Sequence, residues 1–509
     1  MERPQLLTFG SKILHTVLVL SGICCLLVFL LKPINDPDFF WHLKSGEWII
    51  QHHAIPQVDP FGINPPDASD PRQKLILTSY WLYQALIAQV FSLCGFSGII
   101  LIRFLLAGIV TFTIWRTFRP FNILNSAICI LSALLFLKEY TLDRPQTLSF
   151  VLYLLMLLLL FRFIDNRSCN RPTLRYAAGM ATVMLVWSNM HGGYLVGQVI
   201  VVLVCITEGA RFLHQSLRPM DRSSYLRLIG IALAALVGSY ANPNFVNIIR
   251  QVDSVFALNS LSSNINTEYI SVFRKWQETG STVILLYYFI AAAALIVAVH
   301  SYRRTDITRL AILFCTGYFG FAHIRYFPFF LIAAVIFIMP TETTESGAKF
   351  IRAVVVIGAA ASLFLCFPYG PVIPEKNNGS RWVTNEIFPV AAVDFLKARK
   401  ARGAIFSHYR WGGYLIWRVA PELKPFIDSR SLDFIRFFDY SYCEEIVEGS
   451  NAADQKCSRI FQEYGINYLL INIHEPSGEA HPLLYSIGEN PDWKLIYKED
   501  NLALFQKND

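Results

Sequence analysis

The chain has 509 residues, of which 54% are hydrophobic and only 16% are charged. Because soluble globular chains carry about 25% charged residues, this composition excludes an ordinary soluble enzyme. The net charge is +7, but the lysines and arginines cluster in short segments between apolar runs. That distribution is typical of orientation signals in membrane proteins, and no nucleic-acid partner is expected.

Apolar runs recur through the first three quarters of the chain. Each is long enough to cross a hydrocarbon core of about 30 Å as a helix. The runs predict about 11 transmembrane helices. A shorter and more polar run at 78–94 is predicted to be an interfacial helix. The predicted spans are 13–32, 98–116, 122–139, 147–164, 174–190, 193–212, 224–241, 280–300, 307–322, 326–340 and 350–367.

The arginines indicate which side of the membrane each loop faces. With the N-terminus in the cytoplasm, four arginine-rich segments all fall on the cytoplasmic side, as the positive-inside rule requires. The loop 33–77 and the chain from about 376 onward then lie on the outer side. Ionisable residues gathered there indicate a site. The four arginine-rich segments are 116–119, 162–175, 211–227 and 303–309.

From about residue 376 the pattern changes to short alternating helices and strands, which predicts a small α/β domain. The expected organisation is a transmembrane domain at 1–370, including the outer loop 33–77, followed by an α/β domain at 376–509. Cys443 and Cys457 lie in this domain, where an outer location allows a disulfide. The predicted helices are 390–400 and 455–464, and the predicted strands are 404–407, 424–428, 467–472, 493–497 and 502–506.

The segment NDPDFFWH follows the first predicted span. Asp36 before Pro37 is a favourable pair for a helix cap and a first helical residue. Asp38 and His42 would then lie on one face of that helix, four residues apart. Carboxylates and an imidazole so placed hold a divalent cation or take a proton from a hydroxyl. The alternative is a plain capped helix in an aromatic membrane-interface belt.

Two further motifs stand at the outer ends of predicted spans. Arg144, in LDRPQ, suits bidentate pairing with phosphate oxygens. The alternative is that Asp143 pairs with Arg144 and caps the next helix. His191 follows in WSNMHGGY, where the two glycines allow close backbone approach. A lone histidine is more often structural, so that alternative also stays open.

Other candidates lie further along the outer side. Glu268, in NTEYISVF, is a candidate second acid. His323 and Arg325 lie between two closely spaced predicted helices. An arginine in that position is costly unless it has an anionic partner, which makes Arg325 a candidate anion-binding residue.

The C-terminal domain contributes three candidates. Trp411 lies in RWGGYLIW after one predicted strand, and Asp428 and Arg430 lie in KPFIDSR after the next. Loops after strand ends are the usual ligand edge of an α/β layer. These residues would therefore bind an acceptor or cover the active site. The alternative is that they attach the domain to the membrane helices.

The D-P-D motif after the first span resembles the acidic motif of the GT-C superfamily of integral membrane glycosyltransferases. The blocks LDRPQ, WSNMHGGY, ANPNF and RWGGYLIW with KPFIDSR are similar to blocks in largely uncharacterised bacterial members. The resemblance implies an inverting transferase of the bacterial inner (plasma) membrane. Its donor would be a sugar on a polyprenyl phosphate, and its acceptor a periplasmic lipid, glycan or protein hydroxyl. The chain lacks the W-W-D-Y-G block of oligosaccharyltransferases.

The resemblance also implies roles for the candidate residues. Asp36 or Asp38 would take the acceptor proton, with Asp36 favoured. Arg144, Arg325 and His191 would neutralise the leaving phosphate. Asp38, His42 and Glu268 would hold a cation such as Mg²⁺ or Mn²⁺. Two alternatives remain: a transporter or flippase for a lipid-linked sugar, and a non-catalytic scaffold for envelope assembly.

Overall fold

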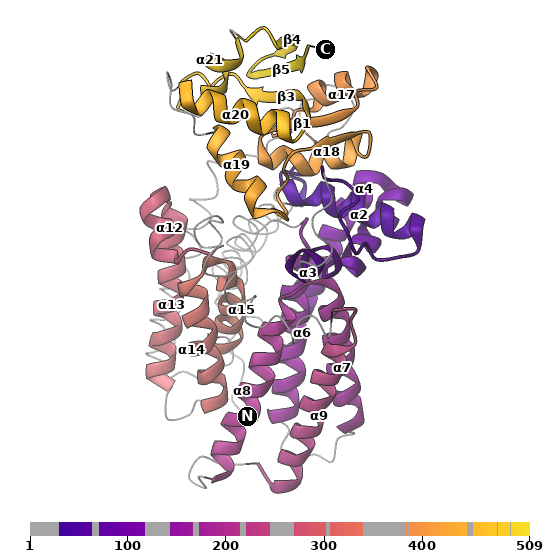
Figure 1. The fold of residues 1–509 in the computed structure, drawn as a ribbon. Helices are drawn as coiled ribbons and strands as arrows, with labels where there is room; N and C mark the ends of the chain where they lie inside the picture. Colours follow the sequence, from indigo (N-terminus) through magenta and orange to yellow (C-terminus); the bar gives the residue numbers. More distant parts are fainter. Residues whose placement is uncertain are drawn as a thin grey trace, which may run out of the picture. The chain divides into compact units, whose positions relative to one another are not determined.

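A computed structural model gives the chain's fold (Figure 1). The chain divides into two compact units, one of Met1–Lys32 with Ile100–Ile373 and the other of Pro33–Ile99 with Pro374–Asp509. The grouping differs from the expected one, which placed 33–77 with the transmembrane domain. The residues that the structure describes are 30–63, 71–117, 143–165, 173–213, 220–244, 269–301, 306–338, 382–383, 387–444, 451–475, 477–488 and 490–508.

All the regular elements in the described part of the first unit are helices. Its helices match the predicted spans that fall within those residues. The predicted spans 122–139 and 350–367, most of 13–32, and Glu268 lie outside the described residues. The helices are the second part of α4 (Trp81–Thr117), α6 (Pro145–Asp165), α7 (Thr173–Met190), α8 (Tyr194–Leu213), α9 (Arg222–Tyr240), α12 (Val272–Thr279), α13 (Thr282–Ser301), α14 (Ile307–Ala322), η2 (Ile324–Tyr326) and α15 (Phe327–Ile338).

Membrane character is clear for part of this unit. Four helices in the described part of the chain are long and apolar enough to cross a membrane, at 81–110, 145–165, 194–212 and 222–240. Shorter apolar helices occupy 287–296, 307–322 and 324–337. The chain is therefore a helical membrane protein.

Helix α4 is two helices joined at a kink. Gly95 has φ 58° and ψ −147°, a backbone conformation that glycine adopts most readily. The kink separates residues 81–94 from the following apolar helix, and the boundary between the two units falls just after it. This agrees with the prediction of a separate helix at 78–94 before a span at 98–116.

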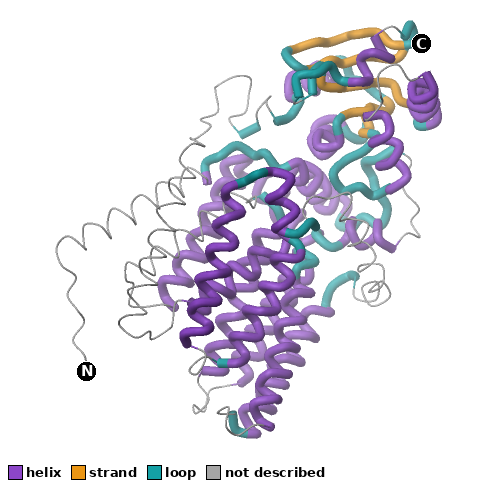
Figure 2. Tube along the Cα trace, turned by 90° about the vertical axis from the view of Figure 1, so that its left-hand side faces the viewer, coloured by secondary structure: helices purple, strands orange, loops and turns teal. Residues whose placement is uncertain are grey.

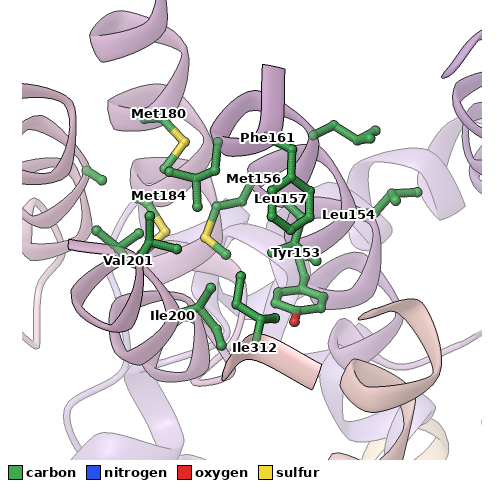
Figure 3. Close-up of a cluster of buried hydrophobic side chains, with 14 of the residues drawn as sticks. Tyr153, Leu154, Met156, Leu157, Phe161, Met180, Met184, Ile200, Val201 and Ile312 are labelled. Carbon is green, nitrogen blue, oxygen red and sulfur yellow. The ribbon is translucent and has the colours of Figure 1, made fainter. Parts of the chain in front are cut away.

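The core of the first unit is apolar and rich in methionine. Met156 of α6, Met184 of α7 and Ile200 of α8 are buried together (Figure 3). Methionine fills irregular gaps between helices well. Small residues bring the helices close, because a Cβ on Gly238 would lie 2.4 Å from the carbonyl oxygen of Ala181. This packing is typical of membrane helices.

The second unit contains a mixed sheet of order β2-β1-β3-β5-β4. Strand β1 pairs in parallel with β2 and β3, and β5 pairs antiparallel with β3 and β4. All described strands, orange in Figure 2, belong to this unit. The strands are β1 (Gly403–Ser407), β2 (Leu423–Pro425), β3 (Ile466–Asn472), β4 (Trp493–Glu499) and β5 (Leu502–Lys507).

Each strand overlaps a predicted one, so the α/β prediction for the C-terminal part is confirmed. The predicted helices also appear, as α17 and α20, while α18, α19 and α21 were not predicted. The helices of the second unit are α2 (Pro37–His52), α3 (Pro71–Thr78), the first part of α4, α17 (Val390–Ala398), α18 (Gly412–Val419), α19 (Phe434–Glu444), α20 (Asn451–Glu463) and α21 (Pro482–Gly488).

A disulfide joins α19 to α20. Cys443 and Cys457 are bonded, with their Cα atoms 5.5 Å apart, which confirms the predicted pairing. Both residues belong to the buried core of the domain, beside Phe406 and Phe426.

Candidate functional site

The D-P-D motif forms the start of α2. The helix begins at Pro37, and an Asp36 Oδ1 atom accepts a hydrogen bond of 2.9 Å from the backbone N–H of Asp38. The predicted cap is therefore confirmed. Asp36 is fully buried, whereas Asp38 is partly exposed, and Asp38 Oδ1 accepts from Trp41 Nε1 at 3.2 Å. Both aspartates therefore stand at the N-terminal end of α2, where the helix dipole is positive.

His42 packs inside the second unit. Its Nδ1 lies 3.2 Å from Gln84 Nε2, and its ring contacts the rings of Tyr80 and Tyr83. These contacts hold α2 against the first part of α4.

The predicted cation site of Asp38, His42 and Glu268 lacks a third ligand within the described residues. Among those residues, one group of three His, Cys, Asp or Glu side chains has its ligand atoms within 4.8 Å of one another, and it lies elsewhere. Glu268 itself is outside the described residues.

That other group consists of Glu444, Glu475 and His481. The Nε2 atom of His481 lies 3.4 Å from Glu444 and 3.3 Å from Glu475. Its Nδ1 atom accepts from the backbone N–H of Leu483, so the proton of the neutral ring is on Nε2. A histidine that binds a metal usually donates through its second nitrogen, so this geometry favours a hydrogen-bonded group over a metal site.

Asp143 pairs with an arginine that the sequence analysis missed. Arg103 of α4 is fully buried and donates to both carboxylate oxygens of Asp143, at 2.8 and 2.6 Å. It also donates to the carbonyl oxygens of Leu30 and Lys32, at 2.9 and 2.6 Å. The expected alternative, a cap made by Asp143 with Arg144, overlooked this partner. An arginine within an apolar run was the available signal.

His191 is held in a network at the end of α7. Its Nδ1 accepts from the backbone N–H of Gly193 at 2.9 Å and lies 2.7 Å from Ser149 Oγ. The Ser149 hydroxyl in turn accepts from Trp187 Nε1 at 2.7 Å. Because Nδ1 accepts, the neutral ring carries its proton on Nε2. A Cβ on Gly193 would lie 2.8 Å from the His191 Nδ1 atom. A larger residue at position 193 would therefore collide with the histidine ring, which explains why this position is glycine.

The structure brings Arg144 and Arg325 close to this histidine. Burial, together with the positive charges of Arg325 and Arg144, lowers the pKa of His191 to about 3. The imidazole is therefore neutral at ordinary pH. Three residues nominated from separate segments of the chain thus meet at one end of the helical unit, and we call Arg144, His191 and Arg325 the basic cluster.

Arg325 and His323 are placed by the segment before α12. The Arg325 guanidinium lies over the ring of Tyr269, 5.2 Å from its centroid, and the Arg325 carbonyl accepts from Gln146 Nε2 at 3.4 Å. His323 Nδ1 donates to the Tyr269 carbonyl at 2.7 Å. His323 therefore holds the backbone beside Arg325.

The C-terminal candidates have partners inside the second unit. Arg430 is buried and donates to Asp428 at 2.7 Å through Nε and again through Nη2. It also donates to Asp59 at 2.8 and 3.1 Å, a residue that the sequence analysis did not single out. Trp411 Nε1 donates to the carbonyl of Ile387 at 3.2 Å. These residues connect segments of the unit.

Comparison with known proteins gives no match to a family model and no match to a curated protein sequence. Solved structures do match. The arabinofuranosyltransferase AftD from Mycobacteria matches with a TM-score of 0.52 and 15% sequence identity. The match covers 97% of this chain and 40% of AftD. The oligosaccharyltransferase AglB from Archaeoglobus fulgidus, solved in complex with an inhibitory peptide and a dolichol-phosphate, matches with a TM-score of 0.50 and 12% sequence identity. The match covers 92% of this chain and 70% of AglB.

Another structure of the A. fulgidus enzyme, in complex with Zn and sulfate, has a TM-score of 0.51 and 13% identity and covers 90% of this chain and 68% of its own. The chain thus spans about two fifths of AftD and about two thirds of the archaeal enzyme. The likeness extends over 90–97% of this chain. The chain therefore shares the fold of these two glycosyltransferases.

Proposed function

We propose that the protein is an integral membrane glycosyltransferase that moves a sugar from a polyprenyl-phosphate donor to an acceptor hydroxyl. The observation that carries the proposal is the basic cluster, in which two guanidinium groups stand near a buried neutral imidazole. Planar guanidinium groups match phosphate oxygens in bidentate geometry. The structure of AglB with a dolichol-phosphate supports a lipid-linked donor.

The cluster would act on the leaving group. As the bond from the anomeric carbon to the phosphate oxygen breaks, negative charge grows on the phosphate. Arg144 and Arg325 would stabilise that charge, and preorganised positive groups do so at little reorganisation cost. His191 is neutral because its pKa is lowered to about 3. Its contribution would be an Nε2–H hydrogen bond and not a charge.

An aspartate of the D-P-D motif would accept the proton of the acceptor hydroxyl. The oxygen then attacks the anomeric carbon opposite the phosphate, and this single displacement inverts the configuration. Asp36 is fully buried and its side chain caps α2, whereas Asp38 is partly exposed. We therefore favour Asp38 as the general base, which reverses the preference drawn from the sequence. A Mg²⁺ or Mn²⁺ ion held by Asp38, His42 and Glu268 stays a prediction.

The proposed location is the bacterial inner membrane, with residues 376–509 in the periplasm. The disulfide between Cys443 and Cys457 supports this, because disulfides persist in oxidising compartments. The acceptor would be a periplasmic lipid, glycan or protein hydroxyl.

A transfer assay tests the proposal. Purified protein in nanodiscs would be given radiolabelled polyprenyl-phosphate sugars together with a periplasmic extract as acceptor source. We expect the wild type to release polyprenyl phosphate and to label a product, and the Asp36→Asn/Asp38→Asn variant to do neither. Movement of intact donor across the bilayer without bond cleavage would favour a flippase instead.

A further inference from the structure

We infer that the C-terminal α/β domain positions the D-P-D aspartates, and that Gly413 and Arg430 are the positioning residues through which it acts. The inference rests on the proposed function and adds a role for the domain. Every contact that carries it lies within the second unit.

The closest approach is at Gly413, the second glycine of the RWGGYLIW block. A Cβ on Gly413 would lie 2.4 Å from the carbonyl oxygen of Pro37 and 3.3 Å from Trp41 Cδ1. Pro37 stands between the two aspartates in the first turn of α2. Since the obstacle is backbone and not a flexible side chain, any larger residue at 413 must displace that turn. The glycine thus allows α18 to support the aspartate-bearing turn directly.

Two further contacts fix the chain on either side of the motif. Upstream, the backbone N–H of Ile34 donates to the carbonyl of Trp382 at 2.8 Å. Downstream, the ring of Phe40 is fully buried. Its centroid lies 5.0 Å from that of Phe388, 5.0 Å from that of Tyr414 and 5.1 Å from that of Trp417. Such aromatic pairs add stability beyond the area they bury.

An ion-pair group fixes the segment that follows α2. Asp59 accepts from the backbone N–H groups of Phe61 and Gly62, at 3.2 and 3.0 Å. The same carboxylate receives the bidentate Arg430, which also pairs with Asp428. The Arg430 guanidinium lies 5.9 Å from the ring centroid of Trp41. Bidentate pairs fix geometry as well as adding energy, so the helix is anchored beyond both of its ends.

These contacts explain two sequence blocks that the proposed chemistry does not use. RWGGYLIW supplies the glycine and aromatic surface that receive α2, and KPFIDSR supplies the arginine that holds Asp59. A displacement of about 1 Å in a catalytic group can cost about 100-fold in rate. We therefore expect a small side chain at Gly413 to lower the catalytic rate by displacing the aspartates, although Gly413 itself is not one of the reacting groups.

The test compares Gly413→Ala with Gly488→Ala in the full-length protein. Gly488 lies in the same domain, and a Cβ there would meet nothing within 4 Å. We expect Gly413→Ala to lower kcat about 100-fold and to leave the donor KM within about two-fold. Gly488→Ala should match the wild type. In the Asp36→Asn/Asp38→Asn background, Gly413→Ala should cause no additional loss, because residues that act through one group are not additive.

Hydrogen exchange measured on the same proteins gives a readout that does not depend on activity. Gly413→Ala and Arg430→Lys should speed exchange in residues 38–44, while Gly488→Ala should not. Retention of the Cys443–Cys457 disulfide, read by mass spectrometry, shows that the domain has folded. Unchanged exchange in Gly413→Ala, or a kcat equal to that of the wild type, would overturn the inference. A wild type without transfer activity would instead count against the proposed function, and the exchange result would still decide the positioning role.

Discussion

Arg103 and Asp143 form a bidentate ion pair in which both side chains are fully buried. The pair joins the kinked helix α4 to the turn that carries Arg144. Arg103 also holds the backbone at Leu30 and Lys32, just before the D-P-D motif in the chain. A single buried charge pair therefore holds together α4, the turn before α6 and the chain at Leu30 and Lys32.

Removal of one partner should be costly. We expect Asp143→Asn to destabilise the protein by about 3–5 kcal/mol, because it leaves the Arg103 charge buried without its partner. The double variant Arg103→Met/Asp143→Leu removes both charges and should be more stable than either single variant. Unfolding in mixed detergent micelles measures both effects. Equal stability of Asp143→Asn and the wild type would show that the pair does not hold the fold.

His191 should make stability sensitive to acid. Its folded pKa, about 3, lies below the ordinary value of 6.5 because of burial and the neighbouring charges of Arg325 and Arg144. The neutral ring thus stabilises the folded state fully above pH 6.5, and this contribution falls as the pH falls toward 3. The loss between pH 6.5 and 5.5 should be about 1 kcal/mol.

The neutral variant His191→Asn provides the matched comparison for that effect. Its unfolding free energy should fall less than that of the wild type over the same pH interval. Parallel pH profiles for the two proteins would mean that His191 is not held neutral by its surroundings.

The two aspartates separate chemistry from capping. Asp36 is the cap of α2 and Asn also caps helices well, while Asp38 is partly exposed. Neither Asp36→Asn nor Asp38→Asn should therefore change the unfolding midpoint by much. Loss of a general base commonly lowers the rate by about 10²–10⁴-fold, and we expect a fall of that size in transfer by Asp38→Asn. Asp36→Asn should have a smaller effect on the rate if it serves mainly as the cap. Full activity in both variants would refute the role of the motif.

The disulfide offers a test of location. Cys443 and Cys457 are 14 residues apart, and closing a loop of this length contributes about 3 kcal/mol to stability. Protein isolated from the envelope should react with maleimide at these positions only after reduction. Cys443→Ser should lower the unfolding midpoint of the domain. Two free thiols in the isolated protein would contradict a periplasmic location.

Local features of the fold could be predicted from the sequence. The cap at Asp36 and the start of α2 at Pro37 follow from neighbouring residues alone, as do the strands of the C-terminal sheet. Helix α18 was missed because its first two residues are Gly412 and Gly413, which read as a turn in isolation. The reason for a glycine at position 413 is visible only in the structure, where α18 approaches the carbonyl oxygen of Pro37 closely.

Partners distant in sequence could not be predicted. Asp59 and Arg430 are 371 residues apart, and Arg103 and Asp143 are 40 apart, so no local pattern links them. Arg144, His191 and Arg325 were nominated separately: Arg144 for bidentate phosphate pairing, His191 for its place beside two glycines, and Arg325 for the cost of an unpaired arginine. Their meeting at one end of the unit depends on how α6, α7 and η2 pack.

The affinity for polyprenyl phosphate, measured in nanodiscs, tests the central claim most directly. Arg144 stands just before α6, and Arg162 lies in the last turn of the same helix, so Arg162→Lys is the matched control. Lysine keeps the charge but loses the bidentate geometry. We expect Arg144→Lys and Arg325→Lys each to weaken binding about ten-fold, as for loss of one charged hydrogen bond, and Arg162→Lys to bind like the wild type. Equal affinities in all four proteins would contradict the assignment of the basic cluster as the donor-phosphate site.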